Sequence, residues 1–114
     1  MPTDRRPPDD ALGFIQKCIR ERSVYWTYHV NMRLAGRYIS RGDIFETVDS
    51  YEIIESYPSD KYLPSYLVLA TAAGDAFHVL FAVDVDSLNV RVVTAYRPSP
   101  HAWEADLRTR RRQS

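Results

Sequence analysis

Side chains capable of proton transfer and anion binding recur at four-residue intervals in the stretch TYHVNMRLAGRYIS, residues 27–40. They are His29, Arg33 and Arg37, and a helix through this stretch would place them along one stripe. Histidine transfers protons near neutral pH, and arginine binds phosphate through two parallel hydrogen bonds. The spacing therefore predicts either a catalytic, phosphate-binding edge or the solvent-facing side of an amphipathic helix.

Cleavage of RNA without a metal needs these same functional groups. A base must deprotonate the 2′-hydroxyl, a cation must offset charge on the phosphate, and an acid must protonate the leaving oxygen. The dipole of the predicted helix would disfavour protonated His29 near its N-terminus, which favours the role of base. The candidates for catalysis are His29, Arg33, Tyr96 and His78. The candidates for binding phosphate are Arg33, Arg37 and Arg97.

Each candidate also has a purely structural interpretation. On spacing alone, a backbone hydrogen bond at the turn into the helix explains His29 better than catalysis does. Arg33 and Arg37 can be solvated or paired with acidic residues. A histidine inside an apolar strand, such as His78, is more often a hydrogen-bonded core residue than a catalyst, and packing can explain Tyr96. Spacing alone leaves both interpretations open.

The sequence lacks the common signatures of cofactor, metal and membrane segments. None of its 4 glycines forms a dinucleotide-binding or Walker loop, no HExxH is present, and its 3 histidines are scattered. We therefore expect no cofactor and no metal. No apolar run approaches the ~18 residues that cross a bilayer, so we expect a cytoplasmic protein without a membrane partner. The single cysteine, Cys18, is predicted to be a core residue in a reducing compartment.

Charge is segregated along the chain although the formal net charge is zero. The stretch from Lys17 to Arg41 and the stretch from Arg91 onward are basic, whereas residues 43–86 are strongly acidic. If the two basic stretches meet in the fold, they form a positive surface that would steer an anionic ligand such as RNA. For Arg33 and Arg37 the alternative is pairing with the acidic middle of the chain.

The pattern along the chain predicts a single α+β domain. Asp9 or Asp10 can cap a helix over residues 10–22, and Thr27 can cap a second over 27–37. Ser40 and Asp43 resemble a capping box that begins a third helix. A short strand ending near residue 26 separates the first two helices. We expect a flexible lead-in over 1–9, the domain over 10–107 and a basic tail over 108–114.

Four further strands are predicted over residues 52–57, 64–72, 76–85 and 89–98. Their short connections favour an antiparallel meander, because a parallel crossover needs a dozen or more residues. The expected fold is N-terminal helices packed on a four-stranded antiparallel sheet. Simple alternation places His78 opposite Phe77, and it places Tyr96 on the same side as Val90 and Val92.

The order of these features resembles a known family, domain-of-unknown-function family 4258 (DUF4258), over about residues 11 to 110. Tyr38 stands where the family has a glycine, and Gly36 lies inside the predicted second helix, where it costs roughly 1 kcal/mol against alanine. The matching pieces are Thr27, His29, Arg33, Arg37, Ile39 and Ser40; Ile53, Ile54, Tyr57 and Pro58; His78 and Val79; Thr94, Tyr96 and Pro98; and Trp103 and Glu104.

The family is similar to small RelE-like ribonuclease-type toxins of toxin–antitoxin pairs. That similarity implies a RelE-like fold, a role in cleaving RNA or blocking translation, and a small antitoxin protein as partner. The leading hypothesis is a metal-independent ribonuclease-like toxin in which His29 transfers protons, Arg33 and Arg37 bind phosphate, and Tyr96 or His78 assists. The first alternative is a non-catalytic protein-binding module whose acidic middle contacts a basic partner. The second is self-association through an exposed strand edge.

Overall fold

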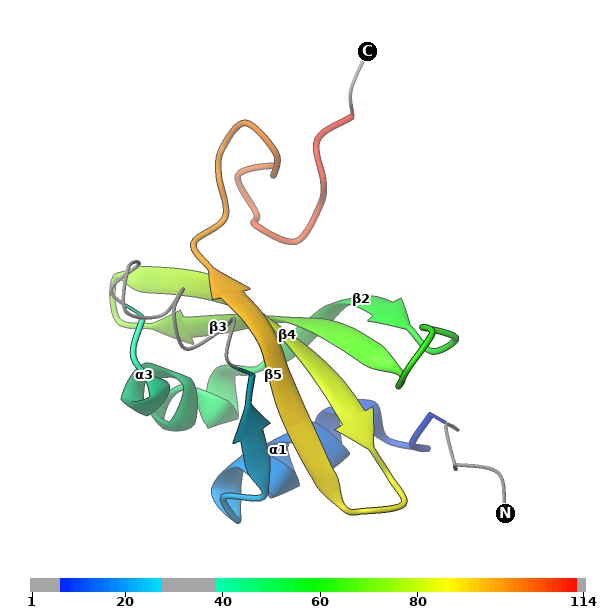
Figure 1. Cartoon of the computed structure of the whole chain (residues 1–114). Coiled ribbons are helices and arrows are strands. Elements are labelled where there is room, and N and C mark those ends of the chain that lie inside the picture. Colours follow the sequence, from blue (N-terminus) through cyan, green and yellow to red (C-terminus); the bar gives the residue numbers. More distant parts are fainter. Residues whose placement is uncertain (1–6, 28–38, 113–114) are drawn as a thin grey trace.

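The computed structural model describes residues 7–27 and 39–112 of the chain, and these residues contain one mixed, five-stranded sheet (Figure 1). The strand order is β1-β5-β4-β3-β2. Strands β2 to β5 pair antiparallel, whereas β1 runs parallel to β5. The α+β class is confirmed, but the four-stranded antiparallel sheet of a RelE-like plan is wrong. The strands are β1 Val24–Trp26, β2 Glu52–Tyr57, β3 Ser65–Ala72, β4 Asp75–Asp84 and β5 Asn89–Tyr96.

The parallel strand β1 departs from the meander because it pairs with a strand far away in the sequence. Short connections restrict the direction only of strands that follow one another along the chain. Three other strands separate β1 from β5, and Val24 and Trp26 pair with the fully buried Val90 and Val92. This pairing places β1, which lies within the first basic stretch, beside Arg91 at the start of the second.

The described helices begin at the predicted caps. α1 (Ala11–Arg20) begins after Asp10, whose Oδ1 accepts a hydrogen bond from the Gly13 amide at 3.0 Å. α3 (Arg41–Glu46) begins after Ser40, and Ser40 and Asp43 form both bonds of a capping box. A 3-10 helix, η1 (Val48–Ser50), follows. The predicted helix over 27–37 lies outside the described residues from position 28 onward.

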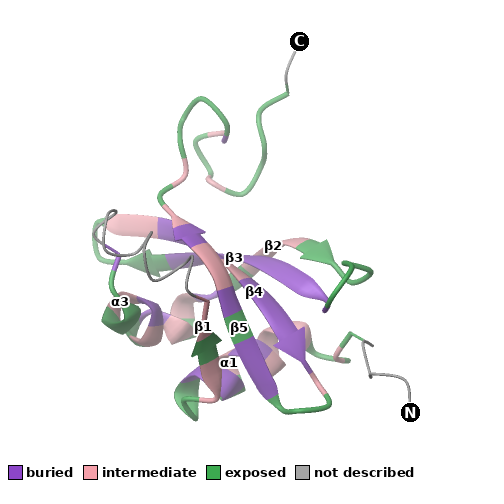
Figure 2. Ribbon diagram, viewed as in Figure 1, coloured by how far each residue is buried: buried purple, intermediate pink, exposed green. Residues whose placement is uncertain are grey.

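The helices cover one face of the sheet and build the core there (Figures 1 and 2). Ile15 and Ile19 of α1 and Ile44 of α3 are fully buried in one cluster with strand residues such as Phe81. Cys18 lies in the same cluster, as predicted, and burial raises the pKa of its thiol. Each large apolar side chain buried here contributes about 1.5–3 kcal/mol. Within the described part of the chain, no helix is long and apolar enough to span a membrane.

A β-bulge in β5 decides which face of the sheet carries Tyr96. The pairing with β4 shifts after Val92, so that Val93 is an extra residue and alternation reverses beyond it. Tyr96 therefore lies beside His78, on the face opposite the helices. The prediction that Tyr96 shares a side with Val90 and Val92 is wrong. Simple alternation assumes a strand without a bulge, and the extra residue moves Tyr96 to the other face.

A second bulge has the same effect in β2. The register against β3 shifts between Ile53 and Glu55, which leaves Ile54 as the extra residue. Glu52 pairs with Leu69, and Glu55 pairs with Leu67, so both carboxylates lie on the face opposite the helices. Without the bulge, an odd separation of three residues would have placed the two carboxylates on opposite faces.

Candidate functional site

Three rows of side chains cross the face of the sheet opposite the helices, which we call the groove face. Residues that pair directly across neighbouring strands share a face, so the strand register defines each row. The first row is Glu52, Leu69, His78 and Tyr96; the second is Glu55, Leu67, Leu80 and Thr94; the third is Tyr57, Ser65, Ala82 and Arg91.

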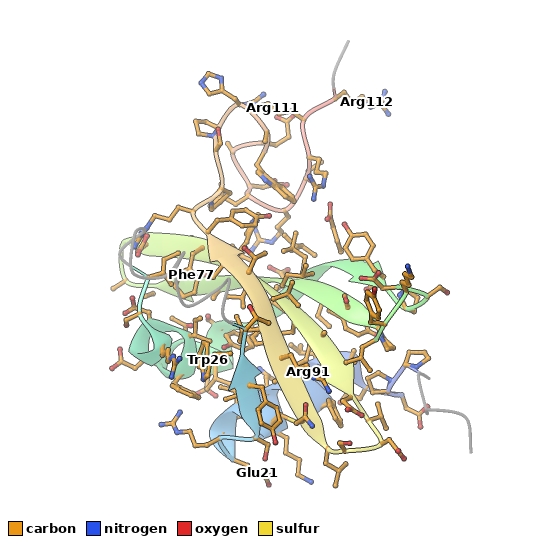
Figure 3. The ribbon with its side chains drawn as sticks, in the orientation of Figure 1. Glu21, Trp26, Phe77, Arg91, Arg111 and Arg112 are labelled. Atoms are coloured by element: carbon orange, nitrogen blue, oxygen red, sulfur yellow. The ribbon has the colours of Figure 1, made fainter. Side chains whose placement is uncertain are left out.

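A pocket of about 610 Å³ lies on the groove face. Leu67 and Leu80 give it an apolar floor, and its lining includes Tyr57 and Tyr96. Glu55 and Arg110 also line it. A second pocket, of about 300 Å³, shares Leu80 with the first and reaches Arg91 on β5, labelled in Figure 3. The two pockets share Leu80 and Asp60 in their linings, and we call them together the groove.

Glu55 is the carboxylate of the larger pocket. Its Oε2 accepts a hydrogen bond from Nε of Arg110 at 2.6 Å, and its Oε1 accepts one from Nη2 at 3.0 Å. The Tyr57 hydroxyl also donates to Oε1. These bonds, above all those from Arg110, hold the pKa of Glu55 below its usual range. Glu55 is therefore ionised at neutral pH and can accept a proton.

Tyr96 is held by a histidine that is fully buried in this structure. Nε2 of His78 lies 2.8 Å from the Leu107 carbonyl oxygen, and Nδ1 lies 3.2 Å from the Tyr96 hydroxyl. A carbonyl oxygen only accepts, so Nε2 carries the proton and Nδ1 accepts from Tyr96. Burial lowers the pKa of His78 and raises the pKa of Tyr96. The pair is thus a neutral imidazole and a protonated phenol.

The lowered pKa of His78 predicts a loss of stability in mild acid. A histidine whose pKa lies below 6.5 in the folded state binds fewer protons than in the unfolded state. Its contribution is present above pH 6.5 and is lost as the pH falls toward the folded-state pKa. We expect the free energy of unfolding to fall between pH 7 and pH 5 more in wild type than in His78→Gln, by up to about 1.4 kcal/mol per pH unit. Urea denaturation at several pH values measures this; parallel profiles would contradict it.

Residues 99–112, which we call the strap, contact the His78 end of the groove face. In Figure 1 the strap is the orange-to-red segment beyond β5, and Figure 3 labels Arg111 and Arg112 on it. Trp103 is buried and packs edge-on against His78 with 4.5 Å between ring centroids. Nε of Arg108 lies 2.6 Å from Oε2 of Glu52. Residues from 108 onward, expected as a basic tail, thus contact the sheet through Arg108 and Arg110.

The candidates named from the sequence lie in three different places. His78 and Tyr96 lie together beside the larger pocket. Arg97 instead makes two hydrogen bonds to Asp75, at 3.2 and 2.8 Å, and lines a different pocket near the β3–β4 turn. The remaining candidates lie outside the described residues: His29, Arg33 and Arg37.

Several groove residues were absent from the sequence-based candidates. The carboxylate of Glu55 reaches this face only because of the bulge at Ile54, and the alternation of residues in the sequence does not predict that bulge. Arg110 was assigned to the tail. The residues added by the structure are Glu55, Tyr57, Arg91, Trp103 and Arg110.

Arginines of the two basic stretches pair with the acidic middle of the chain in the described residues, a pairing that was expected only for Arg33 and Arg37, which lie outside them. An ion pair between exposed side chains is worth only ~0–1 kcal/mol, so such a guanidinium can exchange a carboxylate for a phosphate at little cost. The pairs are Arg20 with Asp49, Arg91 with Asp84, Arg97 with Asp75, Arg108 with Glu52, and Arg110 with Glu55.

The sequence pattern of the family described as "Domain of unknown function (DUF4258)" matches residues 26–97. The chain belongs to the DUF4258 family. The matched residues of this DUF4258 chain include Glu55, His78 and Tyr96, whereas the strap follows them. No curated protein and no solved structure matches the chain. Membership carries no activity with it, since a fold hosts function only through its site.

Proposed function

We propose that this DUF4258 domain is a metal-independent ribonuclease-like toxin that binds RNA along the groove face and is paired with a small antitoxin protein. One observation carries the proposal: the ionised Glu55 and the hydroxyl of Tyr96, backed by His78, line the same pocket. A proton acceptor and a proton donor in one groove are the two groups that cleavage by the 2′-hydroxyl needs.

The proposed step transfers two protons and breaks one bond to phosphorus. Glu55 takes the proton of a ribose 2′-hydroxyl, and the oxygen attacks the adjacent phosphorus. The bond from phosphorus to the 5′-oxygen breaks; the Tyr96 hydroxyl, which donates to Nδ1 of His78 in this structure, turns away from that nitrogen and gives its proton to the 5′-oxygen. The products are a 2′,3′-cyclic phosphate and a 5′-hydroxyl. The raised pKa of Tyr96 keeps the phenol protonated, as an acid must be, and the bond to His78 holds its hydroxyl in place until the proton is transferred.

The groove also suits a single-stranded substrate. The apolar floor and the rings of Tyr57 and Tyr96 can stack unpaired bases, as proteins that bind single-stranded RNA do. Arg91, half exposed at a 3.4 Å contact with Asp84, can exchange this partner for a phosphate. Thr27 lines the second pocket together with Arg91.

Thr27 also directly precedes, in the sequence, the segment that carries the predicted stripe. His29, Arg33 and Arg37 follow it within ten positions of the sequence. In the proposal His29 remains a second proton-transfer group, and the two arginines remain phosphate ligands, together with Arg97 as a ligand farther along the strand. These roles rest on residue type, spacing and the family pattern.

RNA cleavage by the purified full chain tests the proposal. Wild type is expected to cleave single-stranded RNA in the presence of EDTA, leaving 2′,3′-cyclic phosphate ends. Tyr96→Phe and His29→Ala should each lower the rate by about 100-fold, because each removes a proton-transfer group. Tyr66→Phe is the control, since Tyr66 pairs with Phe81 on the helix-facing side of β3 and has no role in the step. Equal RNA survival with wild type and Tyr96→Phe at every dose would exclude this mechanism and favour a non-catalytic protein-binding module.

A further inference from the structure

The strap is a small folded unit of its own. The Glu104 amide donates to the Thr109 carbonyl, and the Arg111 amide donates to the Ala102 carbonyl, both at 2.8 Å. Oδ1 of Asp106 accepts hydrogen bonds from the amides of Arg108 and Thr109 and so closes the turn between the two arms. Because these bonds lie within the strap, it can keep its shape while its contacts with the sheet break.

The strap contacts the very groups that the proposed reaction uses. The Leu107 carbonyl accepts the Nε2 proton of His78, and Trp103 covers the imidazole ring. Two N–H groups of Arg110 are bonded to Glu55, and the guanidinium stacks over Trp103 at 4.6 Å. While the strap is in place, His78 is fully buried and the negative charge of Glu55 is paired with the guanidinium of Arg110.

The strap buries little apolar surface against the sheet. Trp103 is its only buried residue, and most of the strap is green, hence exposed, in Figure 2. The pair of Arg108 with Glu52 is about half exposed on both sides and is therefore weak, whereas the bidentate pair of Arg110 with Glu55, whose side chain is 20% exposed, is the stronger of the two. A segment with few buried apolar contacts belongs to the part of a protein that opens locally.

The strap also lies outside the residues that match the family. The match ends at Arg97, directly after β5, so the rows of the groove face are complete before the strap begins. The strap is therefore an addition to the groove face, and it reaches the larger pocket through Arg110.

We infer that the strap is a detachable cover that holds the site closed, and that its release exposes His78 and Glu55 to the substrate. The inference concerns the regulation of the proposed site and rests on the proposed function. Release removes Arg110, the main cause of the lowered pKa of Glu55, and so makes that carboxylate a stronger base. Release also frees Nε2 of His78 from the Leu107 carbonyl.

The test compares full-length variants in which strap arginines are replaced. The arginines replaced in one variant bond to the sheet, and the arginine replaced in its control bonds within the strap. Arg108→Gln/Arg110→Gln removes both ion pairs between the strap and the sheet. Arg111→Gln is the matched control, because within the described residues the side chain of Arg111 bonds to Glu104 and to the Pro100 carbonyl, both in the strap. Trp103→Ala is a second variant that removes the buried anchor. Thermal melting establishes that each variant is folded.

Each variant is measured in two ways. Diethyl pyrocarbonate labelling of His78, followed by peptide mass mapping, reports whether the strap has left the imidazole. RNA cleavage in EDTA reports whether the site is active. We expect both rates to rise about tenfold or more in Arg108→Gln/Arg110→Gln, because both ion pairs between the strap and the sheet are lost, and to stay unchanged in Arg111→Gln.

The outcomes separate the strap from the chemistry. Unchanged labelling of His78 in both strap variants overturns the inference. Faster labelling with slower RNA cleavage also overturns it, because Arg110 is then a part of the active site, although the proposed function stands. Faster labelling with intact RNA in every variant supports the strap as a removable cover and overturns the ribonuclease proposal.

Discussion

Glu55→Gln is expected to lower the rate of RNA cleavage by about 100-fold or more. The amide is nearly the same size as the carboxylate but does not accept the proton of a 2′-hydroxyl, so the groove keeps its shape and loses its base. Initial rates on a single-stranded RNA in EDTA measure the effect. The binding of an uncleavable 2′-deoxy analogue should change much less, because binding along the groove does not need the base.

Glu52→Gln is the matched control for this prediction. Like Glu55, Glu52 lies on the groove face of β2 and bonds to an arginine of the strap, yet it does not line the larger pocket. Its loss weakens the strap in the same way without removing the proposed base. Cleavage by Glu52→Gln should equal or exceed that of wild type. Equal rates in the two glutamine variants would show that Glu55 is not the base.

Phe81→Ala is expected to lower the free energy of unfolding by about 3–5 kcal/mol. Phe81 is fully buried on the helix-facing side of β4, at a ring distance of 5.6 Å from Tyr51. The Tyr51 hydroxyl donates to the Ile44 carbonyl of α3 at 2.7 Å, and burial raises the pKa of Tyr51. The cavity left by Phe81 therefore weakens packing between the sheet and α3. Urea denaturation measures the loss.

Leu88→Ala serves as the control for Phe81→Ala. Leu88 is 67% exposed in the turn between β4 and β5, so its truncation removes little buried surface. We expect a change of less than about 0.5 kcal/mol, as is usual at exposed positions. A loss of similar size in both variants would mean that the cluster around Phe81 is not the core of this domain.

Features encoded over a few residues were predicted correctly from the sequence. Asp10 caps α1 and the Ser40–Asp43 box begins α3, because a cap depends on side chains only three positions away. The predicted strand over 52–57 coincides with β2, and the other three lie within two residues of β3, β4 and β5 at each end. Alternation of apolar residues within one strand carries that information.

The site depended on features that no short stretch contains. His78 and Tyr96 were named from residue type and family resemblance, but their contact requires the bulge at Val93. Glu55 was not named at all, since only the bulge at Ile54 turns it to the same face. A bulge is stabilised by pairing with the neighbouring strand, so its position follows from the assembled sheet rather than from the strand alone.

The sequence by itself thus determined the α+β class, the helix caps, the strands β2 to β5 and the separation of charge, because each depends on neighbours along the chain. The tertiary structure alone decided that β1 runs parallel to β5, that two bulges gather Glu55 and Tyr96 on one face, and that Arg110 returns to that face. These features join residues tens of positions apart, and which distant groups meet is settled by burial and hydrogen bonding in the packed sheet.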